Sequence, residues 1–222
     1  MGTSYSPNIV EDGLVFYVDP INPRSWTGPS SNRVNNLSSN STGSIFNDTS
    51  GSYGDNSSFA FDGTDDKITF NPITLTTDCT LSAWAKRDST ANMDLLGNTT
   101  TYGYGVYFYG TTNLYIKGSL SGVTNFNNTA IQTALARTDW VHWLFIKDTT
   151  AGTTSVYVDG NLAQSLSHTN PINEINSIGG SGLSTGTQYI WNGSVGPTQI
   201  YNKALSAQEV KQNYNALKGR FI

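Results

Sequence analysis

Carboxylates are the first side chains to examine for chemistry, because their number and spacing limit what the chain could catalyse. Glu occurs only at positions 11, 174 and 209, and the three are isolated from one another. Hydrolysis of a glycosidic bond needs two carboxyl groups at a fixed separation, one as the acid and one as the base or nucleophile. No predicted strand carries such a pair, so we expect no catalytic residues and a protein that is not an enzyme.

The two histidines, His142 and His168, indicate neither a metal site nor a nucleophile. Neither has a Cys, His or carboxylate neighbour at the spacing of zinc ligands, and no serine lies in the Gly-x-Ser-x-Gly motif of a nucleophile elbow. We expect His142 in a strand, on its less apolar face, and His168 in a polar loop. Cys79 is the only cysteine, which excludes an intrachain disulfide, and its apolar neighbours predict that it is buried.

Three aspartates within five residues could hold a hard cation. Asp62, Asp65 and Asp66 follow a short apolar run, and Asp19 ends an earlier one. Calcium takes clustered carboxylates as ligands, but an Asp in a turn also accepts hydrogen bonds from its own backbone. Turn formation is the favoured interpretation of these residues. Calcium is the alternative, and we expect no other cofactor.

Aromatic side chains near loops could stack against the apolar face of a sugar ring. Tyr107 and Tyr109 are predicted to lie on the face of their strand opposite Phe108, which makes them the better surface candidates. Tyr102 and Trp191 complete the set of candidate glycan-binding residues. The alternative is that these rings fill the core, where aromatic side chains bury large areas.

Short strands joined by turns must position these side chains. Residues 13–19 predict a first strand, and residues 140–147 predict a central one, because apolar residues occupy both of its faces. Asp159-Gly160, between two alternating runs, predicts a hairpin over residues 154–165. The other predicted strands are 81–86, 103–110, and a hairpin of 58–63 and 67–70 around a Gly-Thr-Asp-Asp turn.

A single helix is predicted after residue 205. Ser206 and Glu209 have the Ser-x-x-Glu spacing of a capping box, and Leu205 and Val210 have the spacing of a hydrophobic staple. Gly219 is predicted to end the helix in a left-handed conformation. The helix would present one apolar face to the strands.

Composition indicates one large β-rich domain. The chain has 222 residues, of which 13% are charged, and a formal net charge of −4 without a basic stripe, so nucleic acid is not an expected partner. No segment reaches the ~20 apolar residues of a membrane span, and the residues after Met1 lack the features of a secretion signal. We expect an N-terminal arm over residues 1–12, a single domain over 13–222 and a polar surface excursion over 25–56.

Six segments, in order, resemble the laminin-G-like family of concanavalin A-type jelly rolls. They are Gly-Leu-Val-Phe-Tyr-Val-Asp-Pro from residue 13, Phe-Asp-Gly-Thr-Asp-Asp from 61, Thr-Leu-Ser-Ala-Trp from 80, Trp-Val-His-Trp from 140, Tyr-Val-Asp-Gly-Asn from 157 and Ile-Tyr-Asn-Lys-Ala-Leu-Ser from 200. The resemblance implies an all-β sandwich of two antiparallel sheets with one short C-terminal helix. Many relatives carry an Asp-Glu pair where this chain has Gly196-Pro197, so a cation held by that pair would be lost here.

Residues 213–221 resemble versions of this family in structural proteins of tailed bacteriophages. The resemblance implies a non-enzymatic virion structural protein, and we favour capsid decoration on the virion surface, with the major capsid protein as partner. Tail fibres usually trimerise through a coiled coil, β-helix or collagen-like segment, which this sequence lacks. Gly2–Val10 and residues 25–56 are the predicted docking elements. The alternative is a glycan-binding adhesin or lectin-like module of a phage tail or cell surface, with polysaccharide as partner, and either protein could be an oligomer.

Overall fold

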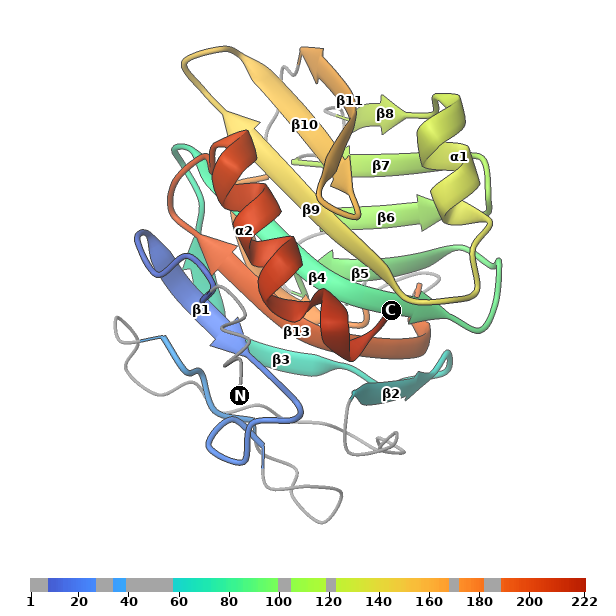
Figure 1. Cartoon of the computed structure of the whole chain (residues 1–222). Coiled ribbons are helices and arrows are strands. Elements are labelled where there is room, and N and C mark those ends of the chain that lie inside the picture. Colours follow the sequence, from blue (N-terminus) through green and yellow to red (C-terminus); the bar gives the residue numbers. More distant parts are fainter. Residues whose placement is uncertain are drawn as a thin grey trace, which may run out of the picture.

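Alternating apolar residues build a sandwich of two antiparallel sheets, as the computed structural model shows (Figure 1). The structure describes residues 8–26, 34–38, 58–99, 105–118, 123–167, 172–181 and 189–222. Within these ranges, thirteen strands form one seven-stranded and one six-stranded sheet. Sheets packed face to face bury the inward-facing side chains of both. The predicted all-β sandwich is therefore confirmed.

The larger sheet contains the predicted central strand. β9 lies between β4 and β10 and is buried along nearly its whole length. Asp159 and Gly160 join β10 to β11 with φ values of 49° and 72°, as a two-residue hairpin turn requires. In sheet order the strands are β1 (Leu14–Val18), β13 (Asn192–Tyr201), β4 (Cys79–Arg87), β9 (Val141–Asp148), β10 (Thr153–Val158) and β11 (Asn161–Ser167), and β2 (Phe59–Asp62) also pairs with β13.

The smaller sheet presents two different faces. In β6, Val106 and Phe108 point into the core between the sheets, so Tyr107 and Tyr109 lie on the outer face. In sheet order the strands are β3 (Ile68–Thr74), β12 (Glu174–Ile178), β5 (Met93–Gly97), β6 (Gly105–Tyr109), β7 (Asn113–Lys117) and β8 (Val123–Phe126).

The predicted hairpin of residues 58–63 and 67–70 is wrong. β2 pairs with β13 in the larger sheet, whereas β3 pairs with β12 in the smaller one. Phe61 and Ile68 both bury their side chains in the core that the two sheets enclose. The chain between them therefore crosses from one sheet to the other, and the same turn chemistry serves a crossover as well as a hairpin.

Aromatic rings fill the space between the sheets. Phe108 of β6 packs edge-on against Trp143 of β9, with 5.0 Å between ring centroids, and against Trp191 at 5.2 Å. Cys79 belongs to the same core, as predicted. Burial raises the pKa of its thiol to about 11, so Cys79 is protonated at neutral pH.

The predicted helix, α2 (Ala207–Leu217), covers the outer face of the larger sheet (Figure 1). Its capping box is present: the Ser206 hydroxyl accepts a hydrogen bond from the Glu209 amide, and the Glu209 carboxylate accepts one from the Ser206 amide. Val210 packs into an apolar cluster with Leu144 and Ile146 of β9. This second cluster attaches the helix to the sheet.

The helix does not end at Gly219 as predicted. A 3-10 turn, η1 (Lys218–Arg220), continues from α2, and Gly219 does not adopt a positive φ. The turn places the ring of Phe221 on that of Trp84, with 4.6 Å between centroids. Because Phe221 packs there, the helix tightens into a further turn instead of reversing at a left-handed glycine.

A further helix, α1 (Thr129–Leu135), lies outside the predicted elements. The Asn128 side chain caps it by accepting a hydrogen bond from the Ile131 amide at 3.0 Å. Asn is a strong N-cap residue, but seven residues are too few for a distinct helical periodicity. In the part of the chain that the structure describes, no helix is long and apolar enough to cross a membrane.

Residues 8–12, expected to belong to an arm, pack against the domain. Val10 is buried, its amide donates to Asn213 Oδ1 at 2.8 Å, and its carbonyl accepts from the Tyr201 hydroxyl at 3.0 Å. The boundary expected at residue 12 thus lies inside packed structure, because Val10 completes the cluster under α2. Residues 1–7 of the predicted arm lie outside the described residues.

Candidate functional site

Four tyrosines gather on the outer face of the smaller sheet. The register of β6 and β7 places Tyr115 directly beside Tyr107, where cross-strand side chains meet. Tyr189, far along the chain, joins them with its ring centroid 4.8 Å from that of Tyr107. We refer to Tyr107, Tyr109, Tyr115 and Tyr189 as the tyrosine cluster.

Tyr107 is the centre of the tyrosine cluster. Its ring centroid lies 5.9 Å from that of Tyr115 and 6.2 Å from that of Tyr109, and only 4% of the residue is exposed. Burial and the neighbouring Tyr189 side chain raise the pKa of its hydroxyl. Tyr109 is 46% exposed. The cluster therefore offers solvent the exposed ring of Tyr109, which the buried ring of Tyr107 and the half-buried ring of Tyr115 hold in place.

A cation and a buried carboxyl group flank the cluster. The Lys117 ammonium lies 4.5 Å from the ring centroid of Tyr107, within the range of a cation–π interaction. Asp94, opposite Tyr107 in the β5–β6 register, is 2% exposed. One of its oxygens accepts a hydrogen bond from the Ser181 hydroxyl, and the other, Oδ1, has no partner among the described residues.

Burial decides the protonation of Asp94. Desolvation raises its pKa to about 7, although the hydrogen bond from Ser181 and the charge of Lys117 act to lower it. A carboxyl group with so large a shift beside an aromatic surface is typical of functional sites. At neutral pH, Asp94 can therefore be either a proton donor or an anion beneath the cluster.

The sequence-based glycan candidates have different positions in the structure. Tyr107 and Tyr109 share the predicted outer face, but only Tyr109 is well exposed. Trp191 is wrong as a surface candidate, because its side chain is wholly buried in the core against Phe108. Tyr102 lies outside the described residues.

Sequence reasoning missed other members of this site. Tyr115 and Lys117 alternate with the core residues Leu114 and Ile116 of β7, and this alternation is a signal that could have found them. Tyr189 has no comparable signal, because the fold alone brings it beside β6.

The three candidate calcium ligands lie together. The ligand atoms of Asp62, Asp65 and Asp66 are all within 4.8 Å of one another, and Asp66 is the buried member. Two of the carboxylates also bond the backbone: Asp62 Oδ1 accepts from the Thr64 amide at 2.7 Å, and Asp66 Oδ2 accepts from the Asp62 amide at 3.0 Å. These three carboxylates could supply ligands to one calcium ion, and their bonds to the backbone are those of turn-forming aspartates.

Asp19, also considered as a calcium ligand, has a different role. Its two oxygens accept hydrogen bonds from the Arg220 guanidinium at 2.9 and 2.6 Å, and Oδ2 also accepts from the Tyr17 hydroxyl at 2.9 Å. The carboxylate is thus neutralised by an arginine. Asp19 lies in an ion pair and is not a calcium ligand.

Ser82 and His142 are 60 positions apart in the sequence, but their side chains lie within hydrogen-bond distance in the structure. Ser82 Oγ lies 2.9 Å from His142 Nε2, while Asp159 accepts from the main-chain amide of His142 and leaves Nδ1 without a partner among the described residues. Both residues are buried, and desolvation lowers the pKa of His142 to about 4. His142 lies on the expected face, but α2 covers it, with Tyr214 5.8 Å from the imidazole. A nucleophile and base need substrate access and an oriented imidazole, so this pair is structural.

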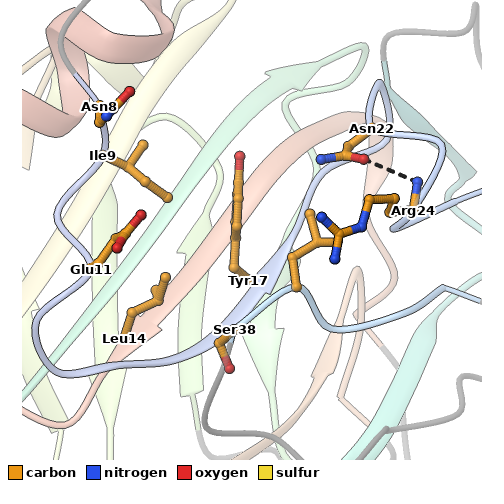
Figure 2. Close-up of a pocket in the computed structure, with 9 residues that line it drawn as sticks. Asn8, Ile9, Glu11, Leu14, Tyr17, Asn22, Arg24 and Ser38 are labelled. Carbon is orange, nitrogen blue, oxygen red and sulfur yellow. Dashed lines mark hydrogen bonds between the residues drawn. The ribbon is translucent and has the colours of Figure 1, made fainter.

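A pocket of about 400 Å³ lies beside β1 (Figure 2). One wall belongs to the N-terminal segment and the other to the segments after β1, so the two regions predicted as docking elements contribute to one pocket. A volume of this size suits a small molecule. The lining residues are Asn8, Ile9, Glu11, Leu14, Tyr17, Asn22, Arg24, Leu37 and Ser38.

Comparison with known families gives a match over much of the chain. Residues 62–211 match a family described as the concanavalin A-like lectin/glucanases superfamily, and this stretch is more than half of the chain. No curated protein matches the chain.

Solved structures with the same fold include two binding domains and a sialidase. The binding domain of botulinum neurotoxin DC, in complex with rat synaptotagmin II, superposes with a TM-score of 0.66 at 12% identity, over 94% of this chain and 52% of that one. Trypanosoma rangeli sialidase, in complex with sialic acid, has a TM-score of 0.67 at 15% identity, over 97% and 36%. The binding domain of Paraclostridial Mosquitocidal Protein 1 has a TM-score of 0.59 at 17% identity, over 93% and 52%. This chain spans about half the length of the binding domains, and the likeness shows the fold.

Proposed function

The chain belongs to the concanavalin A-like lectin/glucanases superfamily, and from this premise we propose that it is a carbohydrate-binding module that contacts sugar through the tyrosine cluster. One observation carries the proposal: the exposed ring of Tyr109 is held by the buried ring of Tyr107 and by Tyr115. A ring already fixed in position loses little conformational entropy when a sugar stacks on it. The cluster is therefore preorganised for stacking.

Polar side chains around the exposed ring suit the hydroxyls of a sugar. Asn113 lies opposite Tyr109 in the register of β6 and β7, and Asn125 lies opposite Tyr115 in that of β7 and β8. Amide groups both donate and accept, as sugar hydroxyls do. The sialidase of the same fold, in complex with sialic acid, supports a saccharide as the ligand class.

Replacement of the exposed ring tests the proposal. We expect the wild-type chain to bind members of a glycan array and Tyr109→Ala to bind the same glycans roughly tenfold more weakly in calorimetry, because the stacking surface is gone. Leu162→Ala is the control, since Leu162 is an apolar residue of β11 that is 57% exposed. The array is run with calcium and with a chelator, which shows whether calcium held by Asp62, Asp65 and Asp66 contributes to glycan binding. An array without hits in both conditions refutes the proposal, and unchanged affinity of Tyr109→Ala refutes the site.

We also propose that binding is not coupled to hydrolysis. Asp94 is a single carboxyl group beneath the cluster, and one carboxyl group cannot be both the acid and the nucleophile. The Ser82–His142 pair is buried under α2 and supports the same view. New reducing ends, released when the protein is incubated with an oligosaccharide that it binds, would contradict this part of the proposal.

Capsid decoration is the second candidate function, and its support is the resemblance of residues 213–221 to bacteriophage structural proteins. Its test is quantitative mass spectrometry of purified particles from the source. Hundreds of copies in fixed ratio to the major capsid protein are expected for decoration. A few dozen copies would favour a tail adhesin, and absence from particles would exclude a virion role.

A further inference from the structure

We propose that the pocket beside β1 is a second saccharide site and that it selects sugars carrying a carboxylate. The pocket lies against an edge strand of the larger sheet, whereas the tyrosine cluster lies on the outer face of the smaller sheet. The two sites therefore share no residue. The inference stands on the pocket's own side chains and does not depend on what the cluster binds.

Two opposite charges face the pocket from its two walls. Figure 2 shows the Glu11 carboxylate and the Arg24 guanidinium on either side of the Tyr17 ring. Two asparagine side chains bind the main chain of Arg24. The Arg24 amide donates to Asn22 Oδ1 at 3.0 Å, and the Arg24 carbonyl accepts from Asn35 Nδ2 at 3.2 Å. The loop is thus fixed through its backbone, and the guanidinium is available to a ligand.

This arrangement sets Arg24 apart from other arginines of the described chain. Arg87 donates to three main-chain carbonyls, Arg137 pairs with two aspartates, and Arg220 pairs with Asp19. In each case the protein supplies the acceptor. None of the ion pairs within the described residues uses Arg24 or Glu11.

The rest of the pocket suits a sugar ring. Tyr17 lies between the walls, with the apolar side chains of Ile9 and Leu14 beside it (Figure 2). The Tyr17 hydroxyl donates to Asp19, which fixes the ring in place. An apolar ring face can pack on this surface, while Asn8 at the rim offers an amide to hydroxyl groups.

The charges decide which sugar fits. A guanidinium binds a carboxylate through two parallel hydrogen bonds, so Arg24 selects an acid group. Glu11 accepts hydrogen bonds from hydroxyls and repels a second anion, which disfavours polyanions. A volume of about 400 Å³ holds roughly one or two sugar rings, and a free amino acid would leave most of it to water.

The test uses two sugars that differ in one group. D-glucuronate and D-glucose differ only in the oxidation of the exocyclic carbon, and calorimetry with ligand-observed NMR compares their binding. We expect glucuronate to bind at least roughly tenfold more tightly than glucose, and Arg24→Gln to remove that preference. Lys86→Gln makes the same change of charge on β4, at a side chain 40% exposed, and should leave glucuronate binding unchanged. Equal binding of the two sugars, or a preference that survives Arg24→Gln, would overturn the proposal.

Further measurements separate this site from the tyrosine cluster. Tyr109→Ala should retain full glucuronate affinity, and its loss would place the ligand on the cluster and overturn the second site. Glycylglycine carries both charges without a sugar ring, so we expect it to displace glucuronate only weakly. Displacement as effective as that by glucuronate itself would assign the pocket to peptides instead.

Discussion

Two buried titratable residues, Asp94 and His142, have opposite effects on how the stability of the fold varies with pH. Burial raises the pKa of Asp94 to about 7 and lowers that of His142 to about 4, because it penalises the charged form of each. In the unfolded chain these groups titrate near 3.8 and 6.5. Asp94 therefore costs stability as the pH rises from about 4 to 7, and His142 costs stability as the pH falls from about 6.5 to 4.

Replacing Asp94 with Asn isolates the first of these effects. The amide keeps the shape and the bond from Ser181 but never ionises, so we expect Asp94→Asn to be more stable than the wild type at pH 8, by up to about 4 kcal/mol. The difference should shrink to less than about 1 kcal/mol at pH 4 and vanish only below the unfolded pKa of 3.8, where Asp94 is protonated in both states. Urea denaturation from pH 4 to 8 measures it, and His142 contributes equally to both chains. A difference that does not vary with pH would show that Asp94 is not buried as described.

At the scale of single elements, side-chain caps decide where the helices begin. Ser206 starts α2, and Asn128 starts α1, each by accepting a hydrogen bond from an amide of the first turn. Lys203 adds to the first cap by donating to Glu209 Oε1 at 2.8 Å. These bonds satisfy amides that a helix leaves without partners at its start.

Removal of the α2 cap has a defined cost. We expect Ser206→Ala to lower the free energy of unfolding by about 1 kcal/mol, because the hydroxyl that accepts from the Glu209 amide and donates to the Glu209 carboxylate is lost, while the main-chain amide of residue 206 still donates to that carboxylate. Ser165→Ala changes an exposed serine of β11 in the same way and should alter stability by less than about 0.5 kcal/mol. Chemical denaturation measures both variants, and equal losses would contradict the role of the cap.

At the scale of the whole molecule, the two outer faces of the sandwich differ in what covers them. α2 and its apolar cluster cover the larger sheet, whereas the smaller sheet presents the tyrosine cluster. The ion pair between Arg220 and Asp19 fastens the end of the helical segment to the strand that begins the sandwich. Residues 201 positions apart are joined in this way.

Breaking the ion pair between Arg220 and Asp19 should lower the stability of the whole fold. We expect Arg220→Met to lower the free energy of unfolding by about 2 kcal/mol, since the buried Asp19 carboxylate loses its positively charged partner, while Arg220 itself is partly exposed. Lys86→Met removes an exposed pair with Asp88 and should cost less than about 1 kcal/mol. Guanidinium denaturation gives both values. If Arg220→Met and Lys86→Met lost the same free energy of unfolding, the ion pair between Arg220 and Asp19 would not stabilise the fold.

Much of the fold follows from the sequence by itself. The Asp159-Gly160 turn, the Ser206 capping box and the apolar strand at residues 140–147 are set by side chains within a few positions of one another, and six ordered segments indicate the family. Local conformational preference and alternation act over such short spans. These features are therefore visible before any tertiary contact is known.

Only the tertiary structure decided which distant residues meet. It places β2 and β3 in different sheets, buries Trp191, brings Tyr189 to Tyr107 and sets Glu11 across a pocket from Arg24. Each outcome depends on the order of strands in the sheets, which local patterns do not encode. Alternation tells which face of a strand a residue occupies, whereas burial depends on what the rest of the chain packs against that face.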